Sequence, residues 1–244
     1  EKKTGTCLHH EHKIEITDLP GTYGLTAFAL DEKVARDYIL TERPDVVVNV
    51  IDTSNIERNL YLTTQLMELQ VPLILVFNMS DMARIRGLVF DIKLLEQYFG
   101  GPIVEAVGHK NKGTENILDA ILTVSSHGHT APAGTLKYGR DIEKQIANME
   151  PAIREDLPLM KTYESITNPD ARSRWLAVKL LEQDPDVEQA ISLDSLKSQV
   201  TRGISAIEKI FRDAPSIVIA DRRYGYISGA CQEAVRNTVE FRHT

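Results

Sequence analysis

The sequence predicts an open α/β domain with a mostly parallel sheet, followed by an all-α domain. Three short runs in the first half are apolar and rich in β-branched residues, as buried parallel strands are, and helical segments separate them: Lys13–Thr17, Val46–Ile51 and Leu73–Phe77. The second half has helical spacing and few strand signals. With 244 residues and 42% hydrophobic content, the chain is long enough for one or two domains with sizeable cores.

The composition changes near residues 124–139, which indicates a boundary between the two parts. Residues 125–134 are rich in Ser, His, Ala, Gly and Pro, a composition typical of linkers. We therefore expect the α/β domain in residues 1–126, a linker in residues 127–138 and the helical domain in residues 139–244.

Prolines and apolar spacing predict a small helical bundle after the linker. Proline lacks a backbone donor and tends to start or end a helix, so five prolines are expected to divide this region: Pro151, Pro158, Pro169, Pro185 and Pro215. Two stretches between them carry apolar anchors, namely Trp175, Val178, Leu180 and Leu181 in residues 172–182, and Leu193, Leu196, Val200, Ile204 and Ile210 in residues 191–210.

Two tetrads follow the first and third predicted strands, and open α/β sheets bind ligands at the carboxyl ends of their strands. The first tetrad is Asp18, Leu19, Pro20 and Gly21, a DxxG pattern. In this place the carboxylate lies near the Mg²⁺ of a nucleotide, and the glycine N–H can approach the terminal phosphate because no Cβ intervenes.

The second tetrad is Asn78, Met79, Ser80 and Asp81, an NxxD pattern. Its aspartate can accept paired hydrogen bonds from guanine N1–H and N2–H₂, a pair that adenine does not offer. Either tetrad alone is a weak signal, and an aspartate after a strand is often a helix cap. Together, in this order, they predict a P-loop-GTPase-like (Ras-like) G domain that binds GTP or GDP with Mg²⁺.

No phosphate-binding GxxxxGK[ST] loop occurs in the 244 residues, and the chain opens at Glu1, close to the first predicted strand. A P-loop GTPase needs that loop for the β- and γ-phosphates and for Mg²⁺. We therefore expect weak nucleotide binding and impaired hydrolysis by these residues alone. Either an upstream segment belongs to the protein, or the chain is a degenerate module.

Composition narrows the class of protein further. No apolar run approaches the ~20 residues of a membrane helix, and no signal peptide opens the chain, so we expect these residues to be water-soluble. Cys7 and Cys231 give no disulfide framework, as in a reducing compartment. The net charge of −7 argues against nucleic acid as a partner.

The sequence resembles the cytosolic GTPase region of the ferrous iron transport protein B (FeoB) family of bacterial and archaeal Fe²⁺ uptake proteins. The resemblance lies in residues Ile16–Leu25, Asp31–Tyr38, Asn59–Leu62, Asn78–Asp81, Pro102–Gly113 and Ala220–Ile227, and so covers most of the chain. In that family the phosphate loop and the switch threonine lie just upstream of a segment like residues 1–3. The resemblance thus implies that the phosphate-binding loop is missing through truncation or disorder and not through evolutionary loss.

The resemblance implies a role for the helical domain and for the rest of the protein. The helical domain is expected to act like a GDP-dissociation inhibitor and to join the GTPase to the protein's own transmembrane domain beyond Thr244. This places the chain at the cytoplasmic face of the cell (inner) membrane, with small accessory iron-transport proteins as partners. It also implies slow hydrolysis, accelerated by K⁺ in some members, and it leaves room for a homo-oligomer.

Residue roles follow from the motifs and the resemblance together. Asp18 is expected to approach Mg²⁺ through a water, and the Gly21 N–H to meet the γ-phosphate. Asn78 and Asp81 would hold guanine while the Met79 stem packs on the base, although simple core filling is an alternative for Met79. The last guanine-contacting loop departs from the Ser-Ala pattern of the family; its residues here are Val107, Gly108 and His109, of which the Gly108 N–H could still reach guanine O6.

No side chain is an obvious catalyst of hydrolysis, so the catalytic residue stays unknown. Ras-like proteins orient water with a glutamine after DxxG, whereas this chain has Thr22 and Tyr23. We expect Glu1, Thr22 and Tyr23 to be switch residues. Arg36 next to Asp37 is interpreted as half of a surface ion pair on a helix and not as an arginine finger.

A cluster near the amino end has the composition of a metal site: Cys7, His9, His10, Glu11 and His12. Alternation along a strand would put Cys7, His9 and Glu11 on one face and the other two histidines on the opposite face, so no face would collect a full ligand set. We expect an exposed hairpin at this position. His127 and His129 in the linker are weaker candidates still.

The sequence therefore predicts a GTPase that regulates or drives Fe²⁺ passage through a membrane portion after Thr244. One alternative is a nonhydrolytic guanine-nucleotide-sensing or assembly module whose helical part binds a protein partner. Another is a GTPase used in ribosome or metallocentre assembly, which would lack the membrane continuation.

Overall fold

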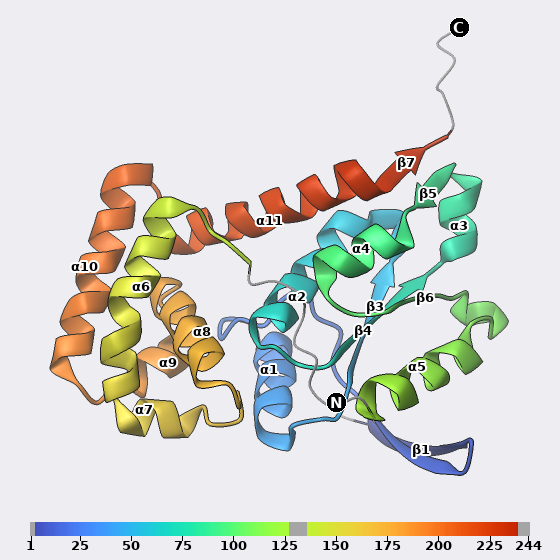
Figure 1. The fold of residues 1–244 in the computed structure, drawn as a ribbon, viewed down its shortest axis with the longest axis horizontal. Helices are drawn as coiled ribbons and strands as arrows, with labels where there is room; N and C mark the ends of the chain where they lie inside the picture. The colour runs from blue at the N-terminus through green and yellow to red at the C-terminus, as the bar shows by residue number, and fades with distance from the viewer. Residues whose placement is uncertain (1–2, 127–135, 239–244) are drawn as a thin grey trace, which may run out of the picture.

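A parallel three-stranded sheet forms the centre of the first half of the molecule (Figure 1). The structure is a computed structural model that describes residues 3–126 and 136–238. Strand β4 (Leu73–Asn78) lies between β3 (Val47–Asp52) and β6 (Ile103–Glu105), and all three are parallel. The predictions for Val46–Ile51 and Leu73–Phe77 are confirmed. Continuous apolar runs suit strands whose two faces are both covered.

Helices cover both faces of this sheet. Leu73, Leu75 and Phe77 of β4 belong to a large core that includes helices α2 (Ile56–Glu68) and α4 (Ile92–Phe99). Ile74 and Val76 point to the other face, where α5 (Thr114–Ser126) packs on them. Helices α1 (Leu30–Glu42) and α3 (Ser80–Ile85) and two short 3₁₀ turns (Thr53–Asn55 and Gly108–Lys110) complete this half.

The first predicted strand is not a buried parallel strand, and this prediction was wrong. Strand β2 (His12–Asp18) pairs antiparallel with β1 (Lys3–His9) in a separate hairpin, and most of its residues are exposed. The reason is visible in the sequence: charged Lys13 and Glu15 alternate with Ile14 and Ile16, the pattern of a strand with at least one face in water.

The described part of the second half contains six helices, as the helical prediction required: α6 (Arg140–Glu155), α7 (Leu157–Thr162), α8 (Pro169–Leu181), α9 (Pro185–Gln189), α10 (Asp194–Phe211) and α11 (Pro215–Ala234). Four of the five prolines lie at the first or second position of a helix, where the missing N–H costs nothing.

The fifth proline does not divide helices as predicted, because Pro151 lies inside α6. A proline within a helix forfeits a hydrogen bond but can be tolerated when tertiary packing holds the helix on both sides of it. Met149 and Ile153, on either side of Pro151, are both buried.

The long helix α11 returns the chain to the sheet domain. After it, β7 (Val235–Asn237) pairs antiparallel with β5 (Leu88–Phe90), and the Asp91 N–H donates to the Ala234 carbonyl at 2.7 Å. The end of the predicted linker is also packed, since Leu136 and Tyr138 are buried. A single large apolar cluster therefore spans both halves, and the exact domain boundaries stay a prediction. Among the described helices, none combines the length and the apolar character that crossing a membrane requires.

Candidate nucleotide-binding site

The NxxD tetrad lies at the carboxyl end of the central strand β4. Asn78 is the last residue of the strand, and Met79 caps α3 in a left-handed conformation with φ of 57°. Ser80 is buried, and its Oγ donates to the Ala106 carbonyl at 3.2 Å. The Met79 side chain is 42% exposed, so it is not simple core filling. The turn thus presents Asn78, Met79 and Asp81 at the ligand-binding edge of the sheet.

The loop after β6 closes over this turn through one side chain. The Gly108 N–H donates to Asn78 Oδ1 at 2.9 Å, and Val107 beneath it is buried. This bond fixes the Asn78 carbonyl oxygen as an acceptor within the protein. Because the Gly108 N–H already has an acceptor, its contact with guanine O6 stays a prediction, as does any contact of exposed His109.

Asp81 is held by two hydrogen bonds. Its Oδ2 accepts from Lys110 Nζ at 2.6 Å, and its Oδ1 accepts from the Met82 N–H at 3.0 Å. The hydrogen bond from Lys110 lowers the pKa of Asp81, so the group is a carboxylate at neutral pH. An ionised acceptor is what the two donors of a guanine edge require.

The DxxG tetrad follows the hairpin, with Asp18 and Gly21 exposed and Leu19 and Pro20 half-buried. Asp18 is the last residue of β2, and the next helix starts only at Leu30 with Ala29 as its cap, so Asp18 is not a helix cap. No hydrogen bond or ion pair in the described part of the chain occupies its exposed carboxylate. Gly21 is exposed, and a Cβ placed on it would meet nothing within 4 Å.

The segment after Gly21 is held by a local hydrogen bond and by contacts with helix α2. Thr22 Oγ1 donates to the Gly24 carbonyl at 2.7 Å, and the Leu25 N–H donates to Gln65 Oε1 at 2.5 Å. Tyr23 is 53% exposed, with the Arg58 guanidinium 3.9 Å from its ring centroid. Glu1, the third predicted switch residue, lies outside the described residues.

The interpretation of Arg36 as half of a surface ion pair was wrong. Its side chain is 3% exposed, and its guanidinium pairs with Asp184 at 2.8 Å and with Asp186, both at the start of α9, as well as with Asp37. Lys33 joins the same cluster through Asp186 at 2.7 Å. Sequence spacing sees only the neighbour Asp37, because the partners lie about 150 positions away.

A second buried ion cluster was not predicted from the sequence. Arg223 of α11 is fully buried and pairs with Glu68 of α2 at 2.7 Å and with Glu182 after α8. The Tyr138 hydroxyl donates to the same Glu68, and Lys179 pairs with Glu182 at 3.0 Å. The only signal was that Arg223 falls within the resembling segment Ala220–Ile227. The two ion clusters join α1 and α2 of the sheet domain to the helical domain.

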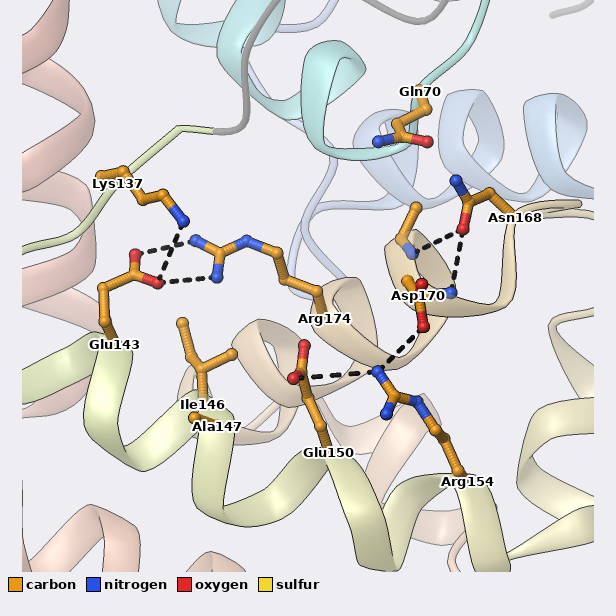
Figure 2. Close-up of a pocket in the computed structure, with 11 residues that line it drawn as sticks. Gln70, Lys137, Glu143, Ile146, Ala147, Glu150, Arg154, Asn168, Asp170 and Arg174 are labelled. Carbon is orange, nitrogen blue, oxygen red and sulfur yellow. Dashed lines mark hydrogen bonds and ion pairs between the residues drawn. The ribbon is translucent and has the colours of Figure 1, made fainter.

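A cavity of about 460 Å³ lies elsewhere, between α6 and α8, and none of the tetrad residues lines it. Figure 2 shows that its charges face one another: Arg174 with Glu143, and Arg154 with Glu150 and Asp170. Because these groups neutralise each other, the cavity offers no uncompensated charge to a nucleotide.

The alternation argument for the amino-terminal histidines was wrong at the hairpin tip. His10 and Glu11 both adopt left-handed backbone conformations, with φ of 46° and 65°. His9 is buried, and both His9 and His10 lie within bonding reach of Asp119 on α5. His127 and His129 lie outside the described residues.

Comparison with known proteins covers nearly the whole chain. Residues 1–121 match the family described as ferrous iron transport protein B, and residues 138–236 match the FeoB cytosolic helical domain. A Fe(2+) transport protein A/Fe(2+) transporter FeoB fusion protein of Porphyromonas gingivalis is 35% identical over 98% of this chain. The Fe(2+) transporter FeoB of Escherichia coli K12 is 30% identical over 98% of this chain. The chain spans 28% and 29% of the length of these two relatives.

Solved structures similar to this chain come from the same family. The mGMPPNP-bound NFeoB of S. thermophilus is 32% identical with a TM-score of 0.77, and the match covers 99% of this chain and 86% of that one. The cytosolic domain of the T. maritima FeoB iron transporter in GDP form II is 28% identical with a TM-score of 0.79, over 96% and 85% of the two chains.

Proposed function

This chain belongs to the ferrous iron transport protein B family, and we propose that it binds guanine nucleotides and hydrolyses GTP slowly. We propose further that its nucleotide state regulates or drives Fe²⁺ uptake through a membrane portion of the protein, at the cytoplasmic face of the inner membrane. The observation that carries the proposal is the pair Asn78 and Asp81 at the end of β4, under the loop that Gly108 ties to Asn78.

The base half of the site fits guanine. The Asp81 carboxylate is the acceptor for guanine N1–H and N2–H₂. The Asn78 NH₂ group takes no part in the hydrogen bond that the Asn78 side-chain oxygen accepts from the Gly108 N–H. Lys110 must share or release Asp81 when the base arrives, which costs little because exposed ion pairs are weak. Relatives with bound GDP, GMPPNP and GDP·AlF4⁻ support the same ligand class.

The phosphate half is only partly represented by these residues. Asp18 has the donor chemistry for Mg²⁺, since the ion prefers oxygen ligands and keeps several waters, and its exposed carboxylate fits an outer position. Bound Mg²⁺ would neutralise charge on the phosphates. The Gly21 N–H would meet the terminal phosphate. No residue of the chain forms a P-loop, so turnover by these 244 residues alone is proposed to be impaired.

We propose that the helical domain restrains GDP release through the two ion clusters. Arg36 lies on α1, the helix that follows the segment after Gly21, and forms an ion pair with Asp184 at the start of α9. Glu68 at the end of α2 forms an ion pair with Arg223 of α11. The terminal phosphate would shift the segment from Thr22 toward Leu40 between an ordered and a disordered state. The fusion relative of P. gingivalis supports a small accessory iron-transport protein as a partner.

Titration calorimetry tests the function. GDP, with ATP as comparator, would be titrated into the 244-residue chain and into the same chain preceded by its family's phosphate loop. Guanine-selective binding that the extension strengthens is the expected result. No guanine-selective binding by either protein would overturn the proposal and favour the nonhydrolytic, partner-binding alternative, which the lack of an evident catalytic side chain after Gly21 also supports.

Substitution of Asp81 tests the base assignment. Asp81→Asn reverses the acceptor pattern at purine position 2, so the preference should move from GDP toward xanthosine diphosphate. Lys110→Met is the matched control, because it removes the partner of Asp81 and keeps the acceptor. An unchanged guanine-to-xanthine preference in Asp81→Asn would reject the assignment.

A further inference from the structure

The tip of the β1–β2 hairpin meets helix α5 at a cluster of metal-ligating side chains. Figure 1 shows the hairpin beside α5. His9 Nε2 lies 2.7 Å and His10 Nε2 3.2 Å from the same oxygen, Asp119 Oδ1. The ligand atoms of these three residues all lie within 4.8 Å of one another. Glu115, one helical turn before Asp119, lies 3.5 Å from His9 Nδ1.

The backbone of the tip brings the two neighbouring histidines to the same side. His9 and His12 are the last pair of the ladder, and both residues between them have positive φ, the geometry of a primed two-residue turn. Such turns favour glycine and asparagine, and other residues pay strain of about 1–3 kcal/mol. The His12 ring also donates to the His10 carbonyl at 2.8 Å, which fixes the turn.

The burial of the cluster distinguishes it from scattered surface charges. The His9 ring is 7% exposed and stands between two carboxylates, Glu115 at Nδ1 and Asp119 at Nε2. The side chains of His10 and Asp119 are 70% and 54% exposed, so the opposite side is open to water. An ion there would therefore have protein ligands on one side and room for water ligands on the other.

We propose that His9, His10 and Asp119 bind a divalent first-row transition metal ion such as Co²⁺ or Zn²⁺. His9 Nε2, His10 Nε2 and a carboxylate oxygen of Asp119 are the ligands, while Glu115 orients the His9 ring through its other nitrogen. Two imidazoles select against Mg²⁺ and Ca²⁺, which prefer oxygen ligands throughout.

The site is independent of the nucleotide tetrads. β2 has seven residues and runs from the hairpin tip to Asp18, a length of roughly 20 Å at 3.3 Å per residue. The ion would fix one end of this strand to α5 while Asp18 serves the nucleotide at the other end. The inference therefore stands whether or not the chain hydrolyses GTP.

Co²⁺ titration of the full chain, followed by the visible d–d absorption of the bound ion, tests the proposal. The expected result is one ion per chain, displaced by Zn²⁺. The double variant His9→Gln/His10→Gln and the single variant Asp119→Asn should each weaken binding by about tenfold or more, since even outer-shell changes cost 10–100-fold. Asp119→Asn changes a partly exposed side chain without changing its size, so it is expected to leave the fold intact.

The chain supplies a matched control. The double variant His127→Gln/His129→Gln removes the same number of imidazoles elsewhere and should bind Co²⁺ as the parent chain does. Saturating Zn²⁺ should also raise the Tm of the parent chain and not that of Asp119→Asn, because an ion stabilises only the state that binds it. Equal Co²⁺ affinity in the parent chain and Asp119→Asn, or loss only in the His127/His129 variant, would overturn the proposal.

Discussion

Replacement of Arg223 by methionine is predicted to destabilise the protein strongly. Arg223 is fully buried between Glu68 and Glu182, whose side chains are 8% and 11% exposed. Methionine fills much of the same volume but leaves Glu68 without its cation and Glu182 with Lys179 alone. Removal of one partner from a buried ion pair costs about 3–5 kcal/mol, a large part of the stability of a typical domain.

The pH dependence of the loss identifies its cause. Burial raises the pKa of Glu182, but the charges of Arg223 and Lys179 more than offset burial and lower the pKa to about 2. Because this value lies below the ordinary value of 4.5, Glu182 stabilises the parent protein above that pH, and the contribution is lost as pH falls toward 2. In Arg223→Met the cation that lowers the pKa of Glu182 most is absent. Glu182 therefore takes up a proton at a higher pH than in the parent protein, and this removes a poorly compensated buried charge from the variant. The difference in stability between the two proteins should therefore shrink as the pH is lowered.

Urea unfolding followed by circular dichroism, at about pH 8 and about pH 4, measures both effects. Arg222→Met is the matched control: Arg222 is exposed next to Arg223 and stacks on Phe211 at 5.6 Å, so its loss should cost less than about 1 kcal/mol. A loss below about 1 kcal/mol for Arg223→Met, or a loss that does not change with pH, would refute the reasoning.

Three further predictions follow from other contacts. Arg36→Met strands Asp184 without its cation, so it should release the clamp on α1 and speed the loss of fluorescent GDP in stopped flow; an unaltered off-rate would reject the coupling. Asp156 accepts from Ser192 Oγ at 2.7 Å and from the N–H groups of Ser192, Leu193 and Leu159, and these donors outweigh burial and lower its pKa. Its stabilisation is present above the ordinary pKa of 3.8 and is lost as pH falls below that value, so Asp156→Asn should cost about 2 kcal/mol at neutral pH and less in acid, measured by urea unfolding. Gly113→Ala places a Cβ 2.5 Å from the Glu105 carbonyl at φ of 92°, so a thermal scan should show a loss of about 1–3 kcal/mol, and an unchanged Tm would contradict the geometry.

The parts of the fold that the sequence predicted are those with local causes. Continuous apolar runs marked β3 and β4, and prolines at helix starts marked α7, α8, α9 and α11, because burial on both faces and a missing N–H act within a few residues. The strands β5 and β7 escaped prediction, since each has three residues and neither carries a pattern of its own.

The candidate nucleotide site was likewise predictable from motif and context. Asn78 and Asp81 follow a strand that any reader of hydrophobic patterns would identify, and the structure places both at its carboxyl end. The bond from Gly108 to Asn78 was not predictable, because the two residues are thirty positions apart and meet only once β6 pairs with β4.

The sequence by itself determined the central strands β3 and β4, the helical character of the second half, the two tetrads and the membership of the chain in its family. Only the tertiary structure decided which charges are buried and with whom. Arg36, Arg223 and His9 look like surface residues in sequence, yet each meets carboxylates more than a hundred positions away. A charged side chain is buried only when the fold supplies a partner of opposite charge, and that partner is chosen by packing between distant elements, which no local pattern records.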